Sequence, residues 1–178
     1  MRYYFHLNPN SKGLKQDFVM EDKEHHLICE AVMTKNSIFK PCTYDFINHL
    51  SGSTKTYAMG HPVQKSEGIA NVGNVRIAQI YDSHFKIDGV NNWEYFESRG
   101  YKTDIKPHKL GEIVDLTKDG VVIAHLESAG RNLFEDDPKG DTGLLNAIHS
   151  SGNYRVDCSE ENLDIAFLLC FSLSRTDV

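Results

Sequence analysis

Ser159 to Leu173 reads S-E-E-N-L-D-I-A-F-L-L-C-F-S-L, and this stretch decides the fold. From Leu163 onward it is almost unbroken apolar, so on a helix of about 100° per residue its apolar side chains point in every direction. A helix that is apolar all round has to be surrounded by lipid or by protein. Spanning a bilayer takes about 17–25 apolar residues, and this run is shorter and contains Asp164 and Ser172. The stretch therefore predicts a buried core helix over 159–174, with the rest of the chain wrapped around it.

The two ends of this helix carry polar residues of suitable kinds. Ser159 is a good N-cap, and Glu160 and Glu161 place negative charge at the positive end of the helix dipole. Ser172 can return its hydroxyl to the carbonyl one turn earlier, so its burial need not be costly.

The segment before the helix, residues 1–158, is predicted to be mostly β. Arg2–Leu7 alternates around aromatic residues, and a short strand, a polar turn and a second strand recur at Phe18–Val32, Phe85–Glu97 and Ile113–Leu126. Asp119-Gly120 is the strongest of the three hairpin turn signals. Further strands are expected at Cys42–Leu50, Thr54–Val63, Val72–Tyr81 and Tyr154–Cys158. Regularly spaced short strands indicate a sandwich or a barrel, and a large barrel needs an interior filling such as the apolar helix.

The overall composition predicts one soluble domain over residues 1–178. The chain is 40% apolar and 25% charged, with a net charge of −6, so global charge gives no reason to expect nucleic acid or an anionic membrane as partner. The start lacks an apolar secretion segment. Four widely spaced cysteines predict reduced thiols in a cytoplasmic protein: Cys29, Cys42, Cys158 and Cys170. We expect no transmembrane segment and no cofactor.

The tail Tyr154–Leu173, together with the hairpins Phe18–Val32, Phe85–Glu97 and Ile113–Leu126, resembles the tubby C-terminal-like superfamily. Within it the pattern is most similar to the LURP-one-related proteins and their small bacterial relatives. The resemblance implies a closed antiparallel barrel of about twelve strands around a central hydrophobic C-terminal helix. Tubby proteins bind phosphoinositides and the related phospholipid scramblases act with calcium at membranes, but the functional residues of neither map onto this chain.

One acidic loop is a candidate calcium site. It runs from Glu135 to Gly143 and contains Asp136, Asp137 and Asp141, and calcium takes six to eight oxygen ligands from such turns. The D-x-[DN]-x-[DN]-G spacing is absent, and an ordinary solvated turn explains the same composition.

His25-His26 is a weak metal candidate. Adjacent strand residues point to opposite faces, and no second ligand pair lies at zinc spacing, so a surface turn is the simpler interpretation. The other histidines are scattered singly. The chain has no G-x-S-x-G elbow and no phosphate loop, so nothing in it argues for an enzyme.

The candidate site for an anionic head group is the basic cluster Arg99, Lys102, Lys106 and Lys109, which surrounds Tyr101. Glu97 and Asp104 dilute its charge, and a solvated face is the common alternative. We therefore expect a non-catalytic binding or scaffold module in the cytoplasm, with an anionic phospholipid at the membrane periphery or a protein as partner. The alternative is a calycin-like barrel that carries a small apolar ligand; it requires the C-terminal helix to pack outside. A small enzyme would require histidines and carboxylates to converge in one cleft.

Overall fold

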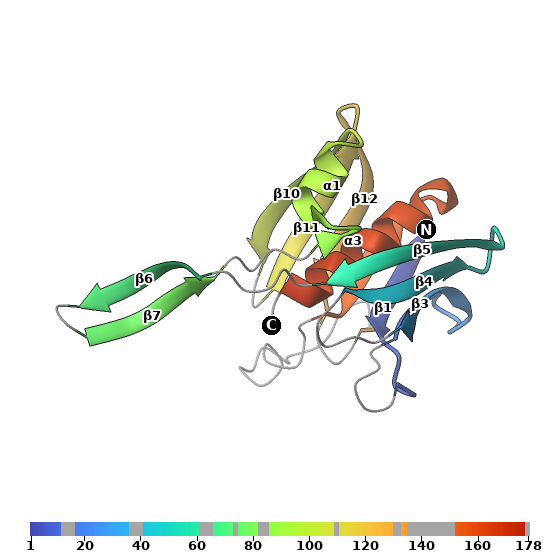
Figure 1. Cartoon of the computed structure of the whole chain (residues 1–178). Helices are drawn as coiled ribbons and strands as arrows, with labels where there is room; N and C mark the ends of the chain where they lie inside the picture. The colour runs from blue at the N-terminus through green and yellow to red at the C-terminus, as the bar shows by residue number, and fades with distance from the viewer. Residues whose placement is uncertain are drawn as a thin grey trace.

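The fold is a large antiparallel sheet curled around a C-terminal helix (Figure 1). The computed structural model describes residues 1–11, 17–35, 41–60, 66–72, 75–81, 86–108, 111–129, 133–134 and 152–176. Eleven strands form the sheet in the order β10-β11-β12-β13-β1-β2-β3-β4-β5-β8-β9, while β6 and β7 form a separate hairpin that extends away from the sheet. The mainly β class with a C-terminal helix is thereby confirmed.

The strands have the following bounds: β1 Arg2–Leu7, β2 Phe18–Glu21, β3 Leu27–Lys35, β4 Cys42–Asn48, β5 Ser53–Gly60, β6 Ser66–Val72, β7 Val75–Tyr81, β8 Lys86–Ile87, β9 Val90–Asn91, β10 Tyr101–His108, β11 Gly111–Lys118, β12 Val121–Ser128 and β13 Tyr154–Cys158. The helices are α1 Asn92–Glu97, a 3-10 turn at Glu160–Asn162 and α3 Leu163–Thr176.

The α3 helix lies inside the curve of the sheet, as its sequence predicts. Ala166 to Leu173 are all buried, and in Figure 1 the helix runs between the β10–β12 strands and the β3–β5 strands. Phe167 packs its ring against Phe5 of β1 and Phe46 of β4, at centroid distances of 5.4 and 5.5 Å. The Ser172 hydroxyl donates to the Leu169 carbonyl at 3.0 Å, so this buried polar group is satisfied within the helix.

The entry to α3 differs from a simple capped helix. Ser159 has an extended backbone before the 3-10 turn, but its hydroxyl makes no capping bond to a backbone N–H. It donates instead to the Glu161 carboxylate at 3.3 Å and accepts from the Asn162 amide at 2.9 Å. The residue is therefore at the predicted place without the predicted cap hydrogen bond.

The segment Trp93–Glu97 is helical, so the prediction of a strand there was wrong. Asn91 caps α1 by accepting a hydrogen bond from the Trp93 N–H at 3.0 Å. Glu94 follows three residues after this N-cap, which is the spacing of a capping box. The chain thus turns out of the short β8–β9 hairpin into one helical turn and a half, and then enters β10.

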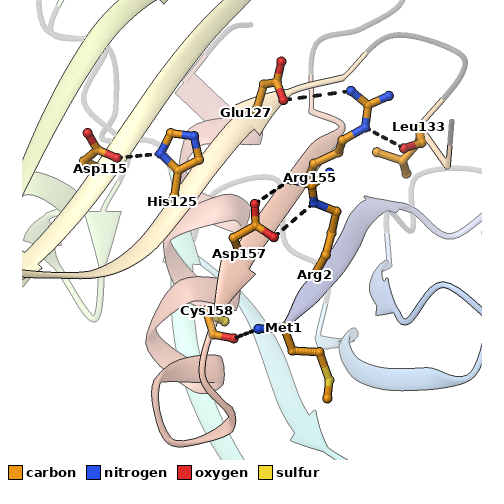
Figure 2. A network of polar contacts seen from close by, with 9 residues as sticks. All are labelled: Met1, Arg2, Asp115, His125, Glu127, Leu133, Arg155, Asp157 and Cys158. Atoms are coloured by element: carbon orange, nitrogen blue, oxygen red, sulfur yellow. Dashed lines mark hydrogen bonds and ion pairs between the residues drawn. The ribbon is translucent and has the colours of Figure 1, made fainter. Parts of the chain in front are cut away.

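The first strand lies between the second and the last, which joins the two ends of the described chain. β1 pairs with β13 on one side and with β2 on the other. Figure 2 shows the polar contacts that cross the first of these pairs: Arg2 donates twice to Asp157, at 2.8 and 3.0 Å, and the Met1 amine donates to the Cys158 carbonyl at 3.0 Å. Because Arg2 and Asp157 are both about 40% exposed, this ion pair stabilises the fold by less than about 1 kcal/mol.

The same outer surface carries a second set of ion pairs further from the chain terminus. Buried Arg155 donates to the Leu133 carbonyl at 3.0 Å and lies 3.9 Å from the Glu127 carboxylate (Figure 2). His125 lies 2.6 Å from Asp115 across β11 and β12. These contacts link β11 to β12 and β12 to β13 on the side of the sheet that faces away from α3.

The sheet ends at β10 on one side and at β9 on the other, and no hydrogen-bonded strand pair joins these ends among the described residues. Between them α1 contacts β8, β9 and β10. A seam therefore remains in the wall next to α3. Because α3 occupies the interior, the space that a calycin-like barrel gives to an apolar ligand is filled by protein.

Candidate functional site

An open pocket of about 370 Å³ lies in this seam, between β5 on one side and α1 and β10 on the other. The first turns of α3 form its floor, with Ile165 and Leu168 as apolar floor residues. Ligand sites commonly measure about 300–1,000 Å³, so the pocket has the volume of a small site. We define it as the seam pocket, lined by Lys55, Tyr57, Tyr95, Arg99, Tyr101, Glu161, Asn162, Asp164, Ile165 and Leu168.

Three tyrosines from three elements form the walls of the seam pocket. Tyr57 belongs to β5, Tyr95 to α1 and Tyr101 to β10, and the rings of Tyr57 and Tyr95 meet edge to face at 6.4 Å. Burial raises the pKa of Tyr57, and the charge and hydrogen bond of Tyr95 raise it further, so Tyr57 stays a neutral phenol. Such rings offer apolar area together with hydroxyl groups that can donate or accept hydrogen bonds.

Arg99 is an exposed residue of the pocket lining that is oriented by contacts with Tyr95 and Ser98. Its guanidinium carbon lies 3.6 Å from the centre of the Tyr95 ring, and its Nη1 donates to the Tyr95 carbonyl at 3.0 Å and to the Ser98 hydroxyl at 3.3 Å. Stacking on the Tyr95 ring and hydrogen bonding through Nη1 orient the planar guanidinium group before any ligand binds. Arg99 can therefore bind a carboxylate or a carbonyl group in the pocket at little entropic cost.

The opposite wall carries an ion pair anchored to the β4–β5 hairpin. Asp164, in the first turn of α3, accepts from the Asn48 amide at 2.6 Å and from the Lys55 ammonium at 2.7 Å. Burial alone would raise the pKa of Asp164, but these two hydrogen bonds outweigh it and hold the pKa below its usual value. Asn48 in turn accepts from the backbone N–H groups of Leu50 and Ser51, so the hairpin turn and the helix start form one unit.

A second, small cavity of about 10 Å³ is lined by this ion pair and by Cys29. It is large enough for about one water molecule. Burial raises the pKa of the Cys29 thiol, so it is not a thiolate nucleophile. The cavity shares Lys55, Tyr57 and Asp164 with the seam pocket.

Two strand edges border the seam pocket. β5 pairs with β4, and its outer edge pairs with β8 only at Met59 and Gly60; beyond this, Asp88 bonds the backbone of Ala58. Within the described chain, the outer edge of Ser53–Tyr57 has no strand partner. Among the described strands, β10 pairs only with β11. Pro107 has no N–H to donate to β11, so its nitrogen faces the outer, unpaired edge of β10. Backbone groups of a strand alternate in direction with a period of two residues. The N–H and C=O groups of Thr103 and Ile105 therefore face the same outer edge.

The structure separates the predicted basic cluster. Arg99 lines the seam pocket, whereas Lys102 follows pocket residue Tyr101 in a strand and so points to the opposite face. Lys106 lies 2.8 Å from Asp104 and 3.4 Å from Asp115, which offset its charge. The predicted head-group site therefore does not form one convergent patch from these three residues. Lys109 lies outside the described residues.

The predicted calcium residues Asp136, Asp137 and Asp141, with Glu135, also lie outside the described residues. A different group of metal-capable side chains is present: in the turn between β2 and β3, ligand atoms of Asp22, Glu24 and His26 lie within 4.8 Å of one another. His26 lies 2.9 Å from Asp22. The hydrogen bond with Asp22 raises the pKa of His26, which favours a closed, charge-balanced pair in this exposed turn.

Comparison with protein-family models, with curated proteins and with solved structures found no match to this chain. Of the helices in the described part of the chain, none has the length and apolarity needed to cross a membrane.

Proposed function

We propose that this protein is a non-catalytic binding module that takes an extended peptide segment of a protein partner into the seam pocket. The observation that carries the proposal is a pair of strand edges that reach one tyrosine-lined pocket. The edge Ser53–Tyr57 of β5 contributes Lys55 and Tyr57 to the lining, and the outer edge of β10 begins at the lining residue Tyr101 and continues through Thr103 and Ile105. A peptide strand there would gain main-chain hydrogen bonds from an edge and side-chain contacts from the pocket, which is how strand addition works in other binding domains.

The chemistry of the pocket supports binding rather than catalysis. Lys55 and Asp164 neutralise each other, Tyr57 is held as a neutral phenol, and no described histidine lines the pocket. Arg99 offers a fixed cation to an acidic side chain or to a backbone carbonyl. The two cations and two carboxylates around the pocket balance, so a peptide of mixed polarity suits it better than a highly charged ligand.

An added strand also relates the proposal to the barrel that the sequence predicts. Eleven strands form the sheet and its ends are not joined by a strand pair among the described residues. A peptide strand in the seam would extend the wall between β5 and β10 and complete a closed barrel of about twelve strands, the architecture of the tubby-like superfamily. On this proposal the protein is a cytoplasmic tubby-like module that its partner completes.

The test combines peptide selection with a block of one strand edge. A displayed library of random ten-residue peptides is selected against the full chain, and the affinity of a selected peptide is measured by fluorescence polarisation. Thr103→Pro removes one outward N–H from the β10 edge and places a ring in the path of an added strand, so it should weaken peptide binding by at least about tenfold. The matched control Thr103→Val keeps the backbone N–H and should bind as the original chain does.

Hydrogen exchange locates the bound peptide independently. Peptide binding should slow exchange of the amides in Ser53–Tyr57 and at Thr103 and Ile105, while the amides at the β11–β12 turn keep their rates. Equal peptide affinity in Thr103→Pro and Thr103→Val, with both variants folded by circular dichroism, would remove the β10 edge from the proposal. Salt-sensitive binding to phosphoinositide vesicles without any selected peptide would instead favour an anionic head group as ligand.

A further inference from the structure

His6 and Glu21 meet on the outer face of the sheet, away from α3. The register pairs His6 with Val19 and Tyr4 with Glu21, so His6 and Glu21 are diagonal neighbours on β1 and β2. His6 Nε2 lies 3.5 Å from Glu21 Oε2, and the two side chains are 16% and 22% exposed. The Phe134 ring covers His6 edge to face at 5.9 Å. This places an imidazole nitrogen beside a carboxylate in a largely covered position.

The hydrogen bonds of His6 show which nitrogen carries the proton. His6 Nδ1 lies 2.9 Å from the Leu7 carbonyl oxygen, and a carbonyl can only accept, so Nδ1 is the N–H donor. In the neutral ring Nε2 then carries a lone pair. This atom is buried and makes no hydrogen bond to any residue that the structure describes, although the Glu21 carboxylate is its neighbour. With the ring neutral, two acceptors face each other at 3.5 Å, and either a proton on Nε2 or a metal ion between the two atoms would relieve this arrangement.

A second imidazole reaches the same carboxylate oxygen. His25 Nδ1 lies 3.4 Å from Glu21 Oε2, and the His25 ring packs on Phe134 with centroids 4.2 Å apart. The His25 backbone is left-handed, with φ of 63°, a conformation that few non-glycine residues adopt and that directs this side chain back toward β2. Glu21 Oε2 is therefore contacted by one nitrogen from β1 and one from the turn that follows β2.

We propose that His6, Glu21 and His25 bind a divalent transition-metal ion, with zinc as the best fit. Zinc bonds of about 2.0–2.2 Å to imidazole nitrogen and carboxylate oxygen separate neighbouring tetrahedral ligands by about 3.3–3.6 Å, and both nitrogen–oxygen distances fall in this range. The Nδ1–H bond of His6 to a backbone carbonyl is the outer contact that metal-bound histidines usually make. Unlike Asp22, Glu24 and His26, this set does not have all of its ligand atoms within 4.8 Å of one another. The ring of His25, whose side chain is 62% exposed, therefore has to turn to bring both imidazole nitrogens onto one ion.

The neighbouring group Asp22, Glu24 and His26 is the competing site in this turn. Its Asp22 oxygens already accept from the backbone N–H groups of Glu24 and His26, and His26 Nδ1 lies 2.9 Å from Asp22 Oδ2. These groups already have hydrogen-bond partners, whereas Nε2 of His6 has no hydrogen-bond partner within the described chain. The assignment to His6, Glu21 and His25 follows from that difference.

The test is titration of the full-length protein with Zn²⁺ alone, followed by calorimetry, with Co²⁺ absorption as a report of ligand geometry. The original chain should bind one ion through this set. His6→Gln, Glu21→Gln and His25→Ala should each weaken Zn²⁺ binding by at least about tenfold. Circular dichroism and melting temperature of each variant show whether it is folded, and the His25→Ala change lies in an exposed turn, where folding is least at risk.

Two further variants act as controls. His49 Nε2 lies 3.0 Å from Glu30, an isolated histidine–carboxylate pair elsewhere on the sheet, so His49→Gln should leave the affinity unchanged. His26→Ala should also leave it unchanged. No Zn²⁺ binding by the original chain, or equal affinity in any of the three ligand variants, would overturn the assignment. Loss of binding in His26→Ala with full binding in His6→Gln would move the ion to the competing group and refute the proposal as well.

Discussion

Replacing Phe167 with alanine tests whether α3 is the centre of the core. Phe167 is 2% exposed and contacts rings of two strands that lie on different parts of the sheet, Phe5 of β1 and Phe46 of β4. Both contacts are close to edge-to-face, the favourable geometry for aromatic pairs. The substitution removes a whole ring from a position where protein surrounds it on all sides.

The expected cost follows from the burial. Core substitutions of phenylalanine by alanine cost about 3–5 kcal/mol, because the lost transfer free energy and the residual cavity add. We expect about 4 kcal/mol for Phe167→Ala, since the two neighbouring rings are themselves held by the sheet and cannot fill the space. Domains commonly unfold with about 5–15 kcal/mol, so this single change removes a large part of the total.

Urea denaturation followed by circular dichroism measures this loss. With a slope of about 2–3 kcal/mol per molar urea, the midpoint should fall by about 1.5 M. Val121→Ala, at a residue 63% exposed beside the β11–β12 turn, is the control and should change the free energy of unfolding by less than about 0.5 kcal/mol. A loss below about 1 kcal/mol for Phe167→Ala would refute the interior placement of α3.

Three further predictions concern charge, backbone and surface. Asp164 has a pKa below its usual value in the folded chain, so its ionised carboxylate adds to the free energy of unfolding above about pH 4–5, and this stabilisation is lost as the pH falls through the folded pKa. Asp164→Asn should therefore destabilise the chain at pH 7 but not in acid. Denaturation midpoints measured across this pH range test the prediction. Gly120 has φ of +78° with open space beside it, so Gly120→Ala should cost about 1 kcal/mol in urea denaturation through backbone strain alone. Neutral replacement of Lys102, Lys106 and Lys109 together should abolish any co-sedimentation with anionic liposomes. The melting temperature should barely change, because the ion pairs of Lys106 are exposed. Liposome binding that survives the triple replacement would exclude β10 as a lipid-binding surface.

The parts of the fold that were predictable are those that a local pattern determines. The all-round apolar run from Leu163 required a surrounded helix, and Asp119-Gly120 required a tight hairpin, where both residues have the positive φ expected of this pair. The strand expected at Trp93–Glu97 was a helix because the Asn91 cap and Glu94 together form a start signal that the aromatic alternation concealed. The β6 strand was not predicted, since its sequence has little alternation.

The seam pocket could not be predicted in the same way. Its residues come from β5, α1, the turn before β10, β10, the 3-10 turn and α3, and Arg99 is the one lining residue that belonged to a predicted site. The predicted basic cluster assumed that cations close in sequence share a surface. The alternation of β10 instead points Lys102 to the face opposite Tyr101, away from the pocket that Tyr101 and Arg99 line. The meeting of His6 with Glu21 and His25 depends on the register of β1 against β2, which the sequence does not reveal before the fold is known.

The place of α3 in the chain has a consequence for synthesis. Every described strand precedes the helix, and β1 must wait for β13, about 150 residues later, before its second edge is paired. The inward faces of all these strands therefore leave the ribosome before the residues that cover them. A contact pattern of such long range folds slowly, and the exposed apolar strands are open to aggregation meanwhile. We expect the nascent chain to depend on chaperones until α3 has emerged, and ribosome-stalled chains that end before Leu163 to be degraded by protease while those that extend well past Thr176 resist it.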